Sequence, residues 1–233
     1  MIDYSLYLCT NSEMNNNHPL EYCVEQAIIG GVTIIQIREK EKNYNEFFEI
    51  AFRIKKVTDK YNIPLIINDN IEIAINLNAD GLHIGQNDIS CLNARKLLGC
   101  KKIIGVTVTN LDEAKRAIES GASYLGVGAI YKSKTKSEAV IVGVDELQKI
   151  VNYSSIPVVV IGGINKNTIP MLENIKIDGY AMIRPILEQE DIVESTKVLK
   201  KLVDNNKKKY LDSLQKVSND TQKKCMQYLM TEH

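Results

Sequence analysis

The sequence is poor in the residues on which several classes of binding protein depend. None of its 233 residues is Trp and only 6% are aromatic, which argues against a stacking platform for single-stranded nucleic acid. Lys and Arg together number 29, as do Asp and Glu, so no overall positive charge favours nucleic acid. No run approaches the roughly 18 apolar residues of a membrane span. We therefore expect no nucleic acid and no membrane as partner, and any anion site must be local.

Cysteine and histidine are also scarce. The five cysteines are widely spaced without a CxxC pair, and there are three histidines. An odd number of cysteines at such spacings argues against a disulfide framework or a zinc knuckle. No cysteine has the His and Asp partners that would make it a nucleophile. The N-terminus carries Asp3 and no basic stretch before an apolar run, so we expect no signal peptide and a cytoplasmic protein.

Short apolar, β-branched runs recur along the chain between amphipathic segments. The runs are 6–10, 32–37, 63–68, 80–85, 102–107, 123–128, 156–163 and 179–184. Near-continuous apolar runs suit strands that are covered on both faces, and helical patterns lie between them, as in 43–61 and 110–121. We expect Asn110 to cap the latter helix, Glu113 to complete a capping box and Gly121 to end it. This alternation predicts a parallel α/β fold.

The number of strands favours a closed barrel over an open sheet. Eight strands within about 185 residues predict a (β/α)₈ barrel. An open doubly wound sheet usually has a glycine-rich loop after its first strand, whereas residues 10–19 read TNSEMNNNHP and contain no glycine. We expect the barrel to occupy residues 1–203.

The C-terminal stretch differs from the rest. It is polar and Lys-rich and has no strand signal. Residues 188–203 suit the eighth barrel helix, and the segment NNKKK (205–209) predicts a solvated turn. Beyond it, apolar residues recur near heptad spacing, from Leu211 and Leu214 onward, so we expect 204–233 to be a helical extension. This helix is either a surface appendage or a contact for a homodimer or another partner.

Distinctive polar residues fall where the predicted strands end, which in such barrels is the side of the active site. Alternation sends Gln36, Arg38 and Lys40 of the second strand to one side. An Arg offers a planar fork to phosphate oxygens and a Lys a point charge. The alternative is that these are surface charges or helix caps. Their clustering predicts a phosphate-ester site.

Two aspartates follow the third and fourth strands. Asp69 closes IPLIIND and Asp88 falls in DGLHIGQND. Mg²⁺ prefers few carboxylates, several waters and the phosphate oxygens of a substrate, so the pair predicts a magnesium site. The alternative is that Asp69 caps the helix from Asn70 and Asp88 the helix near Ser90.

The ends of the later strands give weaker signals. The loop after the sixth strand, within 126–139, carries Ser133, Thr135 and three lysines, which could bind an anion or simply be solvated. The pair Gly162–Gly163 enters a helix, where a phosphate is favoured; the alternative is a tight turn. For His83, inside GLHIG, we favour a barrel-core residue over a catalytic base.

Together these motifs resemble a known family. LYLCT, GGVTIIQIREK, IPLIINDN, ADGLHIGQND, IIGVTV, GASYLGVGAIYKSKTK, IPVVVIGGI and GYAMI are similar, in order and spacing, to thiamine-phosphate synthase over roughly residues 4–187. The resemblance implies a (β/α)₈ barrel enzyme, a transferase. It would condense 4-amino-2-methyl-5-hydroxymethylpyrimidine diphosphate with 4-methyl-5-hydroxyethylthiazole phosphate, in the presence of Mg²⁺, to thiamine phosphate and diphosphate.

The resemblance also implies roles for individual residues. The residues implied to hold the pyrimidine diphosphate are Gln36, Arg38, Lys40, Asn68 and Lys136, with Glu39 in the same segment. Arg38, Lys40 and Lys136 would act in catalysis by neutralising the leaving diphosphate. Asp69 and Asp88 would bind Mg²⁺, and Thr107 stands where a serine is usual near the pyrimidine. The residues implied to contact the thiazole substrate are Ser133, Lys134 and Thr135, and Gly163, Ile183 and Arg184 match its phosphate site.

Three positions depart from the family pattern. A loop that usually reads Pro-Thr-x-Thr-Lys is Lys132-Ser133-Lys134-Thr135-Lys136 here, and Glu138 replaces an Asp. Arg184 replaces a Ser, and could strengthen, reshape or block the thiazole phosphate pocket. Two alternatives therefore stay open: a thiazole tautomerase-like isomerase, and a degenerate, non-catalytic ligand-binding barrel.

Overall fold

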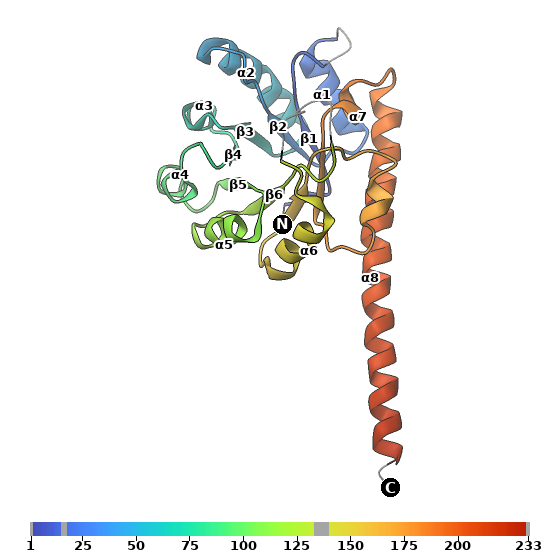
Figure 1. Ribbon diagram of the computed structural model, residues 1–233. Coiled ribbons are helices and arrows are strands. Elements are labelled where there is room, and N and C mark those ends of the chain that lie inside the picture. Colours follow the sequence, from blue (N-terminus) through green and yellow to red (C-terminus); the bar gives the residue numbers. More distant parts are fainter. Residues whose placement is uncertain (1, 15–17, 133–139, 232–233) are drawn as a thin grey trace.

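The computed structural model describes residues 2–14, 18–132 and 140–231, and of residues 217–231 only the backbone. Its eight parallel strands close into a barrel in chain order, which confirms the predicted (β/α)₈ fold (Figure 1). The strands are β1 Leu6–Cys9, β2 Ile34–Ile37, β3 Leu65–Asn68, β4 Gly81–Ile84, β5 Ile103–Val108, β6 Tyr124–Val127, β7 Val158–Val160 and β8 Gly179–Met182. Seven of them lie within one of the eight predicted runs, and β5 extends one residue beyond its run, to Val108.

Helices surround the barrel (Figure 1). They are α1 Leu20–Ile29, α2 Tyr44–Tyr61, α3 Ile71–Asn76, α4 Cys91–Leu98, α5 Leu111–Glu119, α6 Gly143–Tyr153, the 3₁₀ helix η1 Ile169–Leu172, α7 Arg184–Leu187 and α8 Ile192–Thr231. Two hydrophobic cores result. A larger one lies between strands and helices, and a smaller one includes Tyr7, Ile34, Ile66 and Tyr124. The smaller core consists mainly of strand residues that fill the barrel interior, with Tyr4 before β1 packed against them.

The helix ends follow the predicted capping chemistry with one difference. At α5, the Asn110 side chain accepts a hydrogen bond from the Glu113 amide as predicted. The Glu113 carboxylate, however, accepts from the Thr109 amide at 2.7 Å, one residue before the expected position. Gly121 follows the helix with φ of +87°, a left-handed conformation that favours glycine.

The C-terminal helix corrects the predicted turn at 205–209. α8 runs without interruption from Ile192 to Thr231. The Asn206 side chain is buried in it, and its Nδ2 donates to the Ile169 carbonyl at 2.5 Å and to the Tyr180 hydroxyl at 3.2 Å. Lys209 pairs with Glu173 at 2.6 Å. A helix here lets Asn206 donate its hydrogen bonds and Lys209 form its ion pair with the barrel. The polar residues therefore contact the barrel and do not form a solvated turn.

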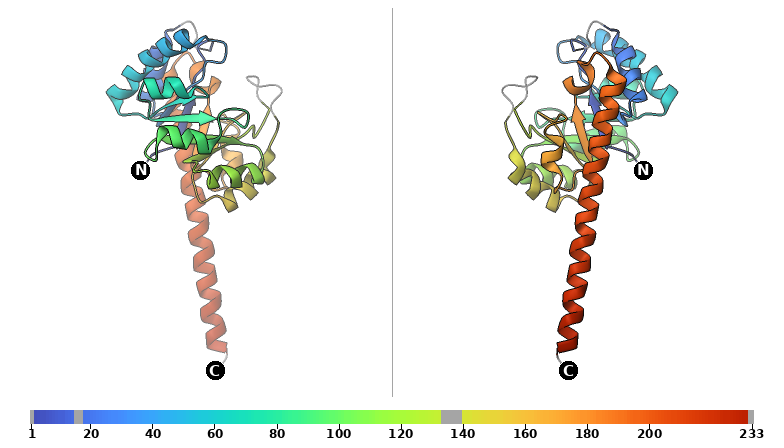
Figure 2. Two further views of the ribbon diagram at one scale, coloured as in Figure 1. Left: turned by 90° about the vertical axis from the view of Figure 1, so that its left-hand side faces the viewer. Right: turned by 90° about the vertical axis from the view of Figure 1, so that its right-hand side faces the viewer.

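The same helix continues past the barrel as a single rod (Figures 1 and 2). Leu211 and Leu214 lie on this part and are exposed. None of the helices within the described ranges combines the length and hydrophobicity that crossing a bilayer requires. Residue 204 as a domain boundary stays a prediction.

Candidate active site

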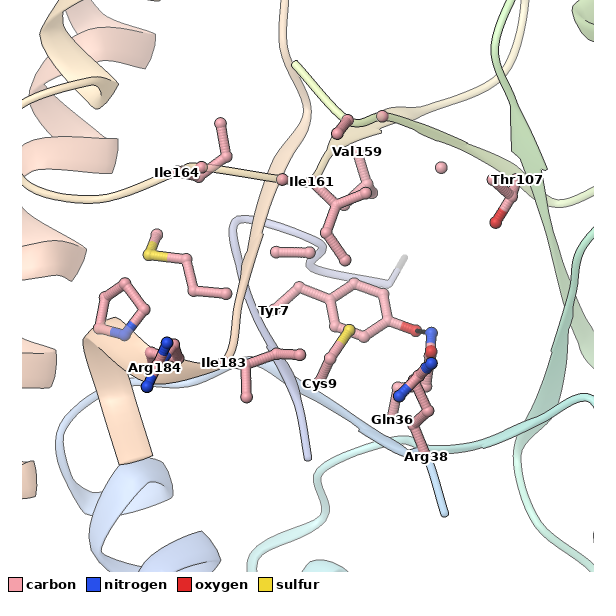
Figure 3. A pocket seen from close by; sticks show the side chains of 18 of the residues that line it. Tyr7, Cys9, Gln36, Arg38, Thr107, Val159, Ile161, Ile164, Ile183 and Arg184 are labelled. Carbon is pink, nitrogen blue, oxygen red and sulfur yellow. Dashed lines mark hydrogen bonds between the residues drawn. The ribbon is translucent and has the colours of Figure 1, made fainter. Parts of the chain in front are cut away.

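A cavity of about 460 Å³ opens among the carboxyl ends of the strands. Seven residues that the sequence predicted for the site line it: Gln36, Arg38, Asn68, Thr107, Gly163, Ile183 and Arg184. They come from β2, β3 and β5, from the segments after β2, β7 and β8, and from the start of α7. In Figure 3, Ile183 and Arg184 lie on one side of the cavity and Thr107 on the opposite side. Segments far apart in the sequence therefore meet in one hollow.

The two predicted metal-binding carboxylates lie together at the rim of this cavity, which we define as Lys40, Asp69 and Asp88. Asp69 and Asp88 are joined by a hydrogen bond between their carboxyl groups, and Lys40 forms an ion pair with Asp69. The rim adjoins the cavity because Asp69 follows Asn68, which lines it. The alternative that the aspartates serve as helix caps is not needed, because the Asn70 and Ser90 side chains cap α3 and α4.

The shared hydrogen bond drives the pKa values of the two carboxyl groups apart. Burial, and next the contact with Asp88, raise the pKa of Asp69 while Lys40 opposes them. Burial also acts on Asp88, but hydrogen bonds from Asp69 and from the Gly85 amide, the latter 2.7 Å long, hold its pKa below the ordinary value. The two carboxyl groups are therefore close enough to act together on one cation.

The rim fits a magnesium ion by its donor set. Two carboxylates leave the remaining ligand positions to water and to substrate phosphate oxygens, as Mg²⁺ prefers. Across the parts of the chain that the structure describes, no group of three or more His, Cys, Asp or Glu side chains gathers as an all-protein metal cage would. The residues present thus suit a metal that is shared with a phosphorylated ligand.

The buried end of the cavity carries polar side chains that the sequence analysis missed. Tyr7 and Tyr124 are fully buried, and their hydroxyl oxygens are 2.7 Å apart. Burial, the largest cause, raises the pKa of both phenols well above 10. Both were interpreted as ordinary strand residues in apolar runs. The available signal was alternation, which sends every second strand residue into the barrel.

His83 is the satisfied barrel histidine that the sequence favoured, but it also lines the cavity. Its Nδ1 lies 2.8 Å from the Tyr124 hydroxyl and its Nε2 lies 2.8 Å from the Thr107 hydroxyl. The side chain is almost fully buried. Both ring nitrogens are therefore engaged by protein hydroxyl groups.

The thiol of Cys9 lies in the cavity lining beside Arg38. Burial raises its pKa to about 12, although the nearby Arg38 charge acts in the opposite direction. A thiol with so high a pKa stays protonated near neutral pH and is a poor nucleophile. This agrees with the sequence argument against a cysteine nucleophile.

Arg184 is held in place at the other side of the cavity. Its Nε donates to Glu188 at 2.7 Å, one turn along α7 and its continuation, and both side chains line the cavity. The neighbouring Gly163 has φ of +69°, and a Cβ there would fall 2.6 Å from the Cβ of Tyr131. The backbone here packs so closely against Tyr131 that only a glycine fits.

The remaining predicted residues are placed differently. Ser133, Lys134, Thr135 and Lys136, with Glu138, lie outside the described residues, and the adjacent Lys132 lines the cavity. Glu39 is not part of the cavity lining, and its carboxylate accepts hydrogen bonds from the Ser12 amide and hydroxyl at 3.2 and 2.7 Å. The substrate and metal-binding roles of all the predicted site residues, these five included, stay predictions.

Comparison with known proteins gives a consistent result. A family model described as "Thiamine monophosphate synthase" matches residues 6–186. Thiamine-phosphate synthase of Clostridium botulinum (strain Eklund 17B) is 49% identical over 203 residues, covering 87% of this chain and 95% of that protein. The Clostridium acetobutylicum enzyme of the same name is 46% identical over 208 residues, covering 89% and 99%. The solved thiamine phosphate pyrophosphorylase of Pyrococcus furiosus superposes with a TM-score of 0.80 at 32% identity, covering 88% of this chain and 98% of that one.

Proposed function

The chain belongs to the thiamine monophosphate synthase family, and from this premise we propose that it is a transferase that makes thiamine phosphate. The reaction joins 4-amino-2-methyl-5-hydroxymethylpyrimidine diphosphate to 4-methyl-5-hydroxyethylthiazole phosphate. The observation that carries the proposal is one cavity with an amide, a guanidinium and a hydroxyl group in its lining and two carboxylates with a Lys at its rim. This set suits a ring that carries a diphosphate.

The bond changes need no covalent intermediate with the protein. The thiazole nitrogen gives its lone pair to the methylene carbon of the pyrimidine, and the carbon–oxygen bond breaks with its electron pair leaving on the diphosphate. Cationic groups near that oxygen stabilise the charge as it develops. Arg38 in the cavity and Lys40 at the rim provide these cationic groups. The resemblance adds Lys136 as a third.

The protein must also hold the two rings against each other, which lowers the barrier by removing the cost of orientation. The cavity supports this because its two sides differ. Gln36, Arg38 and Thr107 would receive the pyrimidine, and Arg184 and Ile183 would receive the thiazole phosphate (Figure 3). The Gly163 backbone, which also lines the cavity, would assist them. An Arg at this position can meet a phosphate directly.

We assign Mg²⁺ to the rim, held by Asp69 and Asp88. When bound, the ion would neutralise charge on the diphosphate. Without the ion, the positive charge of Lys40 partly neutralises Asp69 through their ion pair. Neither the tautomerase nor the non-catalytic alternative explains why two carboxylates and a Lys gather here. A homodimer and a cytoplasmic location stay predictions.

The test is an assay of diphosphate release by the purified protein, with each component omitted in turn. We expect release, and equimolar thiamine phosphate, only when both substrates and Mg²⁺ are present. A tautomerase would release no diphosphate. Binding of both substrates in a calorimeter without turnover would show instead a degenerate barrel, and either outcome would overturn the proposal.

A further inference from the structure

A chain of hydrogen bonds crosses the inner end of the cavity and links five strands. Its members, which we call the floor chain, are Gln36, Tyr7, Tyr124, His83 and Thr107. Gln36 Nε2 donates to the Tyr7 hydroxyl at 2.8 Å, and the Tyr7 and Tyr124 hydroxyl oxygens are 2.7 Å apart. His83 then bridges Tyr124 and Thr107 at 2.8 Å on each side. All five side chains line the cavity.

The floor chain runs in one direction when every buried hydroxyl group is paired. The Tyr7 hydroxyl has two partners within the described residues, Gln36 and Tyr124. Because Gln36 donates to it, Tyr7 must donate to Tyr124; the opposite direction would leave the Tyr7 hydrogen without an acceptor, which is costly in a buried site. Tyr124 in turn donates to Nδ1 of His83, so the imidazole is neutral with its hydrogen on Nε2.

This direction sets what the two ends of the floor chain offer to a ligand. His83 Nε2–H donates to the Thr107 oxygen, so the Thr107 hydroxyl hydrogen is left to point at another acceptor. At the other end, Gln36 uses its Nε2 on Tyr7, so its Oε1 is left as an acceptor. The cavity therefore presents a donor at Thr107 and an acceptor at Gln36.

Two glycines make room for the rings of the floor chain. A Cβ at Gly105 would lie 2.1 Å from Cζ of Tyr124, and one at Gly126 would lie 2.9 Å from Cε1 of His83. These glycines sit on the neighbouring strands β5 and β6, with Gly105 in register with both Tyr124 and His83. The rings fill the space that side chains would take, so their hydroxyl and imidazole groups are held in position.

We propose that Tyr124 and His83 are positioning residues that fix the hydrogen-bond polarity of the cavity and thereby select an aminopyrimidine. The inference rests on the proposed function. An aminopyrimidine donates from its amino group and accepts at its ring nitrogens, which matches Gln36 Oε1 and the Thr107 hydroxyl. The 4-oxo analogue has an accepting carbonyl in place of the amino group and a hydrogen on one ring nitrogen. Its carbonyl would then face the Gln36 Oε1 acceptor, and its ring N–H would face the Thr107 donor. Such mispaired groups in a buried site strongly lower kcat/KM.

The test compares turnover of the 4-amino pyrimidine diphosphate with that of its 4-oxo analogue. Tyr124→Phe removes the hydroxyl that joins Tyr7 to His83 but keeps the ring. We expect the amino-to-oxo ratio of kcat/KM to fall about tenfold, the factor that one mispaired buried hydrogen bond gives. The matched control is Tyr4→Phe. Tyr4 packs on Tyr124 at 5.0 Å between ring centroids but is outside the floor chain, so its ratio should stay at the wild-type value.

A second pair of variants decides the matter if Tyr124→Phe does not fold. His83→Gln keeps an N–H that can reach Thr107, whereas His83→Leu does not. We expect His83→Gln to retain most of the selectivity and His83→Leu to lose it, with binding of inorganic diphosphate alone unchanged in both. Equal selectivity in both variants would overturn the inference.

The outcomes separate this inference from the proposed function. No turnover of either pyrimidine by the wild-type protein would refute the function itself. Turnover with an unchanged amino-to-oxo ratio in Tyr124→Phe would leave the function standing and refute the floor chain as a selector. A wild-type preference for the 4-oxo compound would refute the assigned direction.

Discussion

Lys40 and Asp69 form an ion pair at the cavity rim. The pair joins two predicted roles, because the Lys would hold a diphosphate and the Asp would hold Mg²⁺. Its members lie on different segments, after β2 and after β3, so the barrel brings them together. When a metal ion and a polyphosphate bind together, the metal ion would replace Lys40 as the cation beside Asp69. The polyphosphate would replace Asp69 as the anion beside Lys40. The resting pair thus keeps both charges satisfied until substrate binds.

The rim carboxylates should be essential for turnover. We expect Asp69→Ala and Asp88→Ala each to lower kcat by about a hundredfold or more, because charge stabilisation in the transition state is lost. The matched control is Asp59→Ala on α2, where the Asp is exposed and pairs with Lys55. Steady-state kinetics across a Mg²⁺ titration provides the measurement. Near-normal rates in both rim variants would contradict the metal assignment.

Arg184 should affect the two substrates unequally. Arg184→Ser removes a guanidinium that Glu188 holds on the thiazole side of the cavity. We expect KM for the thiazole phosphate to change about tenfold, the size of one charge-assisted contact, and KM for the pyrimidine diphosphate to stay nearly constant. Glu188→Gln is the companion variant, since it weakens the hold on Arg184 without removing it. Equal changes in both KM values would show that Arg184 is misplaced here.

The buried phenols should make the protein sensitive to alkali. Burial raises the pKa of Tyr4 to about 12 and those of Tyr7 and Tyr124 well above 10. The folded protein then keeps protons that the unfolded chain releases above about pH 10, so this stabilisation is complete below that pH and is lost as the pH rises further. Urea unfolding at about pH 8 and about pH 11 should show a lower midpoint at the higher pH, by this linkage.

The test variant for this alkaline effect is Tyr124→Phe, which removes one buried phenol and should reduce the difference between the two urea midpoints. The exposed Tyr22 gives a neutral comparison as Tyr22→Phe. Identical midpoints at both pH values for the wild-type protein would show that the buried phenols are not linked to folding.

Asn206 should anchor α8 to the barrel. Asn206→Ala leaves the Ile169 carbonyl and the Tyr180 hydroxyl without their donor, which should cost about 1–3 kcal/mol of the free energy of unfolding. Asn205→Ala is the matched control, since that side chain is exposed on the same turn of the helix. Urea unfolding measures both. A loss in Asn206→Ala no larger than in Asn205→Ala would mean that the buried amide contributes nothing.

The barrel could be predicted from the sequence because its signal is distributed over the whole chain. Eight apolar runs separated by helical patterns leave few ways to bury every strand on both faces. The grouping of Gln36, Arg38 and Asn68 followed from strand ends alone, since parallel strands of a barrel finish at one rim. These predictions needed only periodicity and order.

The floor chain and the course of α8 could not be predicted in the same way. Tyr7 and Tyr124 are as apolar as their neighbours in a strand pattern, and their roles depend on hydroxyl groups that meet across more than a hundred residues of sequence. Gly105 was a usable hint, because a glycine in a strand often marks the close approach of another group. Asn206 looked like part of a turn because its partners, Ile169 and Tyr180, are distant in sequence.

The unbroken course of α8 has a practical consequence. Barrel helices run antiparallel to the strands and the cavity lies at the carboxyl ends of the strands, so α8 leaves the barrel on the opposite face. Figure 2 shows its free end standing clear of the barrel. From the buried Asn206 to Thr231, at about 1.5 Å per residue, the helix extends roughly 38 Å. A fluorophore, a surface tether or a fused domain attached at this end of α8 would lie away from the cavity and should leave turnover unchanged.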